Sequence, residues 1–239
     1  DEKGNSLPYL DGISVSFNET RAMEFLLLQQ GKIDFINGID GSVKDLVLNK
    51  KGELKPEFVS KIQMQKAPYL NTEYLGILQN KNSYDNKNHP LLYPKVRAAI
   101  QYAINRQKIV TYFRNGIGIP ADYGFIPKGL QGSNYTQNAG TYTYNPQKAA
   151  QLLKEAGFPN GEGLAPILLS TPESSADVCN YIATELNNIG ITVKVDVMQP
   201  GILRQLMSKG DISFFKAQWI ADYPDAETYL SFFLSTLPA

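Results

Sequence analysis

The chain has 239 residues, and its 23 basic and 23 acidic side chains give a formal net charge of zero at pH 7. Because binding to phosphates needs a basic excess, this balance argues against nucleic acid as a partner. A single cysteine excludes an internal disulfide framework and a cysteine-based zinc site. No apolar run approaches the ~20 residues that a membrane-spanning helix requires.

The first residues predict a strand, a helix and a second strand. Apolar residues alternate with serines over residues 13–17, which is typical of a half-buried strand. Asn18 is placed to cap the following helix, which Gly31 ends, and residues 33–36 predict the second strand. A crossover of this length predicts that the two strands are parallel and in one sheet.

The next stretch predicts short elements. Residues 43–59 indicate a short helix and a charged loop, in which Pro56 starts a further helical turn. Residues 69–78 have the composition of a strand, with Gly76 marking a bulge or a hinge.

Pro94 opens the strongest helical pattern of the chain, which runs to Asn115. The glycine-rich run at residues 116–121 follows this helix instead of a strand and contains a proline, so it is a poor dinucleotide-binding fingerprint. Tyr123 and Phe125 come next, as candidate pocket walls or as the closure of the loop's own small core.

The second half of the chain predicts alternating strands and helices. Asn145 caps a helix that Gly157 ends. Four elements follow: a strand at 167–169, a helix at 177–189 carrying Cys179, an alternating strand at 191–197 and a helix at 202–207. With the next strand, this order is the doubly wound pattern of an α/β lobe.

The most informative stretch is residues 211–230. A short apolar strand at 212–215 is expected to stop before Trp219, and a turn containing Asp222 and Tyr223 follows. Ligands bind at the ends of strands in open α/β sheets, so these three side chains are candidate ligand contacts. The alternative is that Trp219 fills the core and Asp222 caps the next helix.

The motifs of common catalytic sites are absent from the sequence. It has no G-x-S-x-G, H-E-x-x-H, C-x-x-C or P-loop motif, and its one histidine, His89, is expected to face water. Asp222 and Asp225 flank a single turn, and spacing within one loop does not set the separation across a cleft that glycoside hydrolysis needs. We therefore predict a protein that is not an enzyme and has no metal site and no cofactor.

Four motifs carry a resemblance to a known family. They are L-P-Y-L-D-G-I at 7–13, V-R-A-A-I with A-I-N-R at 96–106, Y-N-P-Q-K-A-A-Q-L-L-K-E-A-G at 144–157, and W-I-A-D-Y at 219–223. Together they resemble the extracellular solute-binding proteins of peptide-importing ABC transporters, of the oligopeptide- and dipeptide-binding type.

This resemblance implies an α/β fold of the periplasmic-binding-protein type II class, peptide-binding cluster, in a truncated two-lobe arrangement. Residues 1–70 would be a partial larger lobe, 71–80 a crossover or hinge strand, and 81–239 a smaller lobe that is incomplete at its C-terminus. A fragment lacking its closing lobe is expected to expose apolar surface and to self-associate.

The resemblance also implies a site and a biological setting. Asp222 would pair with the α-amino group of a peptide, and Trp219, Tyr223, Tyr123 and Phe125 would line the pocket. Pro224 sits earlier than the family's usual proline, which changes the shape of the loop. The partners would be a peptide ligand and ABC permease subunits in the membrane, and the full-length protein would be a periplasmic or extracellular lipoprotein.

Two alternatives remain open at the level of sequence. The same fold could bind an oligosaccharide, a nickel complex or another small solute, and Trp219 would suit a sugar ring. The chain could also be an interaction domain with no transport role. The sequence leaves the identity of the ligand open.

Overall fold

The computed structural model describes residues 3–4, 6–18, 20–39, 41–66, 69–80, 82, 84, 88–122, 124–130 and 142–234. The chain divides into two compact units, Asp1–Leu48 and Asn49–Ala239. The lobe boundaries at 70/71 and 80/81 that the sequence suggests remain predictions. No helix among these described residues has the length and apolarity needed to cross a membrane.

The first unit contains two short helices, α1 (Arg21–Gln29) and α2 (Gly41–Val47), which contact each other. The predicted cap at Asn18 is wrong. The Thr20 hydroxyl accepts a hydrogen bond from the backbone nitrogen of Met23 at 3.2 Å, because Thr20 is the residue in extended conformation directly before the helix.

The strands expected at 13–17 and 33–36 are not formed, so the predicted crossover unit is wrong as well. Ile13, Val15 and Phe17 are 80%, 71% and 97% exposed. A strand is stable only when a neighbouring strand completes its hydrogen-bond ladder. No described residue pairs with either segment, so the alternating pattern alone does not produce a strand here.

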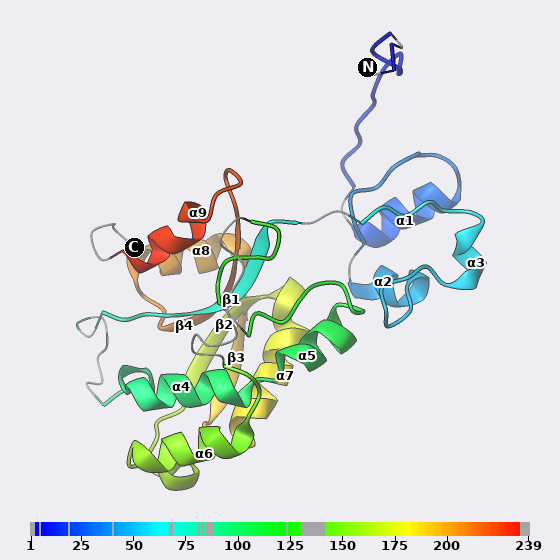
Figure 1. The fold of residues 1–239 in the computed structure, drawn as a ribbon. Helices are drawn as coiled ribbons and strands as arrows, with labels where there is room; N and C mark the ends of the chain where they lie inside the picture. Colours follow the sequence, from blue (N-terminus) through cyan, green and yellow to red (C-terminus); the bar gives the residue numbers. More distant parts are fainter. Residues whose placement is uncertain are drawn as a thin grey trace. The chain divides into compact units, whose positions relative to one another are not determined.

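The second unit is built on a four-stranded sheet with strand order β1-β4-β2-β3 (Figure 1). The strands are β1 (Asn71–Ile77), β2 (Ile167–Pro172), β3 (Val193–Met198) and β4 (Phe214–Ile220). β2 is parallel to both β3 and β4, whereas β1 and β4 are antiparallel. Helix α7 (Ala176–Asn187) connects β2 to β3, and α8 (Pro200–Lys209) connects β3 to β4, which confirms the predicted doubly wound order and the α/β class.

β4 is longer than predicted, because it runs through Trp219 to Ile220 instead of stopping before the tryptophan. The reason is its partner: Thr72 of β1 lies opposite Trp219 and Asn71 opposite Ile220, so the antiparallel ladder continues to the end of β4. Gly76 is opposite Phe215, whose ring occupies the space that a side chain at Gly76 would need. Gly76 thus accommodates an aromatic ring and does not mark a bulge.

Helices α4 (Pro94–Ala103) and α6 (Pro146–Glu155) pack against each other, as Figure 1 shows. The helix expected to run from Pro94 to Asn115 is broken after Ala103, because Ile104 is extended and the Asn105 side chain caps a new turn at Lys108. The shorter elements are α3 (Pro56–Val59), η2 (Pro90–Leu92), α5 (Arg106–Lys108), η3 (Ile109–Phe113), η4 (Pro159–Gly161), η5 (Glu173–Ser175), α9 (Glu227–Leu230) and η6 (Ser231–Phe233).

One buried cluster joins the sheet to these helices. It includes Ile167, Leu169, Val193 and Phe214 from the strands, Val178, Cys179, Ile182 and Leu186 from α7, Val96, Ala99 and Ile100 from α4, and Ala149 and Leu153 from α6. This cluster packs helices α4, α6 and α7 against the sheet.

Candidate functional site

The carboxyl ends of β2, β3 and β4 lie at one edge of the sheet because these strands are parallel. Ser170 of β2 is level with Phe215 of β4, and β4 then continues to Ile220 whereas β2 ends at Pro172. The end of β4 therefore projects beyond the parallel part of the sheet. In open α/β sheets this edge is the usual position of a ligand.

The turn after β4 presents carboxylates. Among the described residues, no hydrogen-bond or ion-pair partner is found for the exposed carboxylate of Asp222. Asp225 accepts a hydrogen bond from the backbone nitrogen of Glu227, the first residue of α9, at 2.8 Å, and Ala226 is the N-cap of this helix. The alternative in which Asp222 caps this helix is wrong.

Tyr223 is half exposed, and its hydroxyl donates to Oε2 of Glu227 at 3.3 Å. The negative charges of Glu227, Asp225 and Asp222, with Glu227 the strongest influence, raise the pKa of the Tyr223 phenol, because they disfavour a further anion. The turn thus has an acidic character, which suits a cationic group better than an anionic one.

Trp219 is half-buried and is not part of the buried core, so it does not act as a core plug. Its ring meets the ring of Phe232 edge to face, with centroids 4.8 Å apart and planes at 85°. The indole Nε1 is buried without a hydrogen-bond acceptor among the described residues.

Aromatic rings from three parts of the chain surround Phe125. Its ring centroid lies 5.1 Å from Tyr74, 5.6 Å from Phe233 and 5.9 Å from both Tyr229 and Phe232. The Thr72 hydroxyl donates to the Phe125 carbonyl at 2.9 Å, which fixes this loop on β1. We call the set the aromatic wall: Tyr74, Phe125, Trp219, Tyr229, Phe232 and Phe233.

The aromatic wall contains two of the candidate site residues predicted from sequence, Trp219 and Phe125. Phe232 touches both Trp219 and Phe125, so these two residues belong to one surface, and Phe232 and Phe233 are 47% and 68% exposed on it. Tyr123, the fifth predicted site residue, lies outside the described residues. Sequence reasoning missed Tyr74 and Phe232, because only the pairing of β1 with β4 and the fold of the last helical turns bring them here.

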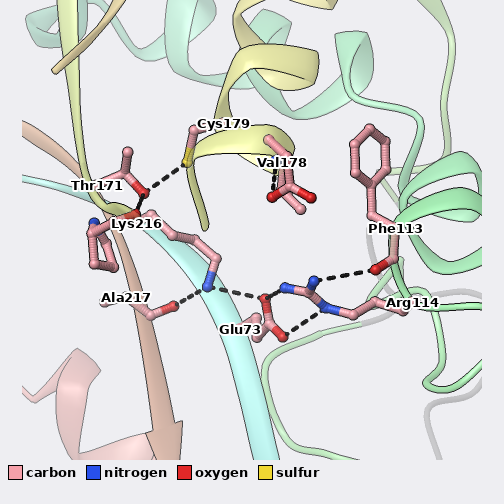
Figure 2. A network of polar contacts seen from close by, with 10 residues as sticks. Glu73, Phe113, Arg114, Thr171, Val178, Cys179, Lys216 and Ala217 are labelled. Carbon is pink, nitrogen blue, oxygen red and sulfur yellow. Dashed lines mark hydrogen bonds and ion pairs between the residues drawn. The ribbon is translucent and has the colours of Figure 1, made fainter. Parts of the chain in front are cut away.

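The opposite face of the β1–β4 pair carries a charged network (Figure 2). Nη2 of Arg114 donates to Oε2 of Glu73 at 2.9 Å and its Nε to Oε1 at 3.3 Å, while Nζ of Lys216 lies 3.1 Å from the same Oε2. Lys216 also donates to the Ala217 carbonyl at 3.0 Å. Side chains alternate between the two faces of a sheet, so this network and the aromatic wall are on opposite sides of the strands that carry the site.

The network sets the charge state of Glu73. Burial raises the pKa of this carboxyl, but the hydrogen bond from Arg114 and the positive charges of Lys216 and Arg114 outweigh it, so the pKa lies below the ordinary glutamate value. No local pattern indicates this triad, since its members are separated by 41 positions or more along the chain.

No group of three or more histidine, cysteine, aspartate or glutamate side chains in the described part of the chain could hold a metal ion. His89 is half-buried, contrary to the prediction that it faces water, because its ring packs on Tyr84 with centroids 4.6 Å apart. Its Nδ1 accepts a hydrogen bond from the Leu91 nitrogen at 3.3 Å, and burial lowers its pKa.

Comparison with known proteins gives the family. Residues 3–239 match the family described as bacterial extracellular solute-binding proteins, family 5, and the chain belongs to that family. The glutathione-binding protein GsiB of Escherichia coli K12 is 29% identical over 233 residues, which cover 94% of this chain and 41% of that protein. The chain thus spans about two fifths of the length of the curated relatives it matches.

Solved structures support the same assignment. The periplasmic binding protein DppA of Helicobacter pylori, in complex with the peptide STSA, is 26% identical with a TM-score of 0.69, over 89% of this chain and 38% of that one. NikA of Brucella suis, in complex with Fe(III)-EDTA, has a TM-score of 0.76 over 100% of this chain and 47% of that one. At 20% identity, NikA bears on the fold alone. The resemblance inferred from sequence and the type II periplasmic-binding fold are confirmed.

Proposed function

We propose that the protein containing this chain is the solute-binding receptor of a peptide-importing ABC transporter. The observation that carries the proposal is the exposed Asp222 carboxylate, which has no partner among the described residues and stands at the sheet edge close in sequence to Trp219. A relative that binds glutathione and a neighbour solved with a peptide support a peptide as the ligand class.

In this proposal Asp222 binds the α-amino group of the ligand. A carboxylate makes a charge-assisted hydrogen bond to an ammonium group that is about twice as strong as a neutral one. The acidic side chains around Tyr223 add to the preference for a cation. Trp219 and Phe125 provide apolar surface for the chain that follows the ammonium group, with Tyr223 and Tyr123 completing the pocket.

The wider setting belongs to the same proposal. It includes binding without catalysis, delivery of the peptide to permease subunits in the membrane, and a lipid anchor. The family of extracellular solute-binding proteins supports a location outside the cytoplasm. The exposed rings of Phe232 and Phe233 support self-association of the 239-residue chain by itself. Residues 71–80, which contain β1, are proposed as the crossover between two lobes.

The test is a calorimetric titration of the full-length protein and its Asp222→Asn variant with tetra-alanine, a peptide with minimal side chains. Asparagine keeps the shape of the side chain and removes the charge, so we expect affinity to fall about ten- to hundredfold. Asp211→Asn is the matched control, because Asp211 is also exposed and immediately precedes the β4 region. Equal affinity of Asp222→Asn and wild type would remove Asp222 from the site.

A further inference from the structure

The charged network of Figure 2 connects the site strand to a distant turn. Glu73 of β1 is held by Lys216 of β4 on one side and by Arg114, which directly follows η3, on the other. The Lys216 side chain is only 7% exposed and that of Arg114 is 30% exposed. The paired, two-point contact of Arg114 with the carboxylate fixes direction as well as distance, unlike an apolar contact.

The turn that begins at Arg114 packs on a loop at residues 49–53. Gly116 has φ 73°, and a Cβ on it would lie 2.7 Å from the Lys50 carbonyl oxygen. Gly52 has φ 70°, and a Cβ on it would lie 3.0 Å from the Asn115 carbonyl oxygen. Two glycines therefore let two backbones approach more closely than any other residue type would allow.

Hydrogen bonds within the loop and within the turn hold each of these two segments in its shape. Oδ1 of Asn49 accepts hydrogen bonds from the backbone nitrogens of Lys51 at 2.8 Å and Glu53 at 3.1 Å. On the other side, the Gly116 nitrogen donates to the Val110 carbonyl at 2.8 Å, and Asn115 is 1% exposed. The loop and the turn should consequently move together.

We propose that Glu73 and Arg114 are positioning residues that couple the end of β4 to residues 49–53, the segment of the second unit that comes first in the chain. The connection runs from β4 through Lys216, Glu73 and Arg114 to the turn at Gly116 and then to the loop. Its role is to set the orientation of the end of β4, which carries Trp219 and leads into the turn that contains Asp222. This role rests on the proposed function, whereas the coupling itself does not.

The first test is a double-variant cycle on the full-length protein, with tetra-alanine affinity as the readout. Glu73→Gln breaks the ion pairs at one end of the connection, and Gly116→Ala breaks the glycine contact at the other. We expect each to weaken binding about three- to tenfold, and the double variant to be no weaker than the worse single one. Multiplied effects in the double variant would overturn the coupling.

Glu155→Gln is the matched control, because it removes an exposed ion pair, Lys95–Glu155 at 3.0 Å, away from the connection. It should leave affinity unchanged, since exposed ion pairs contribute little. A loss of affinity equal to that of Glu73→Gln would assign the effect to general destabilisation and refute the positioning role.

Hydrogen exchange tests the coupling without any ligand. Glu73→Gln should speed exchange in residues 49–53, on the far side of the connection, while α6 keeps its wild-type rates. Unchanged exchange at 49–53 would contradict the coupling. If the wild-type protein fails to bind tetra-alanine, the proposed function is refuted. Hydrogen exchange at residues 49–53 still shows whether Glu73 is coupled to this loop.

The pH dependence of hydrogen exchange at residues 49–53 distinguishes an ion pair from a neutral contact. The folded pKa of Glu73 is lowered, so its ion pairs are fully present above the ordinary glutamate pKa and are lost as pH falls through the lowered value. Arg114 and Lys216 face the carboxylate, and Cys179 of α7 lies within electrostatic range. Protection of 49–53, corrected for intrinsic rates, should fall at acid pH in wild type and show no such step in Glu73→Gln.

Discussion

Two aspartates three positions apart in one turn have different surroundings, and this difference separates a structural side chain from a candidate ligand contact. Asp225 accepts a hydrogen bond from the backbone nitrogen of Glu227, the first residue of α9. Asp222 has no such hydrogen bond among the described residues. A carboxylate that the fold does not use is available to a ligand, which is why the proposal centres on Asp222.

The close approach of Gly190 to the backbone of Asn160 and Gly161 gives a prediction about stability. Gly190 has φ 93°, and a Cβ on it would clash with the carbonyl oxygen of Asn160. We expect Gly190→Ala to lower the free energy of unfolding by about 1–3 kcal/mol, from overpacking and from a left-handed backbone that disfavours a side chain. Urea unfolding of the full-length protein measures this.

Gly201→Ala is its control. Nothing lies within 4 Å of a Cβ on Gly201, and its φ is not positive. Alanine in this helix should leave stability unchanged or raise it by up to about 1 kcal/mol. A Gly190→Ala variant as stable as Gly201→Ala would mean that the contact with Asn160 relaxes easily.

Candidate site residues could be predicted from sequence where a local pattern marks them, as it does for Phe125 in its Gly- and Pro-containing loop and for the turn after β4. Trp219, Asp222 and Tyr223 lie in one segment, and its place after a strand pointed to the sheet edge. Glu73, Arg114 and Lys216 could not be found in this way, because their meeting depends on the register of β1 against β4. The contact of Phe232 with Trp219 could not be predicted for a similar reason, because Phe232 reaches Trp219 only after the chain turns back through α9.

At the scale of elements, the helices with local start and stop signals are the ones that the sequence predicts well. Helix α6 begins where Asn145 accepts the Lys148 nitrogen at 2.9 Å, and Gly157 follows its end with φ 90°. Both signals are local, so no knowledge of the rest of the fold is needed to see them.

The cap of α6 should be measurable. Asn145→Ala removes the acceptor for the Lys148 nitrogen, and we expect a loss of about 1 kcal/mol in the free energy of unfolding, by urea denaturation of the full-length protein. Asn145→Asp should retain most of the stability, since aspartate is an equally good cap. Equal losses in both variants would show that the cap is not the cause.

Strands behave differently because their partners lie far away in sequence. The predicted strands that correspond to β2, β3 and β4 do form, because each has a neighbouring strand in the same sheet. The patterns at 13–17 and 33–36 look as favourable, yet no described residue pairs with them. β4 runs beyond its predicted end because pairing with β1 continues its hydrogen-bond ladder to Ile220. Hydrophobic alternation thus identifies a segment suited to a strand and does not determine whether a partner is present.

At the scale of the whole molecule, this gives a prediction for residues 13–17. Ile13 and Phe17 are 80% and 97% exposed in a chain that covers 41% of a curated relative. We expect the amides of residues 13–17 to exchange slowly with deuterium in the full-length protein, because their alternating apolar pattern suits a strand whose partner lies outside the described residues. Exchange as fast as that of an unstructured peptide would show that the alternating pattern has no partner.

The division of the chain into units also bears on function. The sheet edge, the acidic turn and the aromatic wall all lie in the second unit, residues 49–239. Asp222 and Tyr223 are exposed in the turn after β4 and lie outside the buried core, so substitutions there should change affinity with little effect on folding.

The most direct measurement is mass spectrometry of the full-length protein under non-denaturing conditions, as purified, to identify any ligand carried along. We expect a series of bound species whose masses correspond to short peptides, released when Asp222 is changed to asparagine. A single bound species with the mass of a sugar or of a metal complex would contradict the peptide assignment, while leaving the fold and the family unchanged.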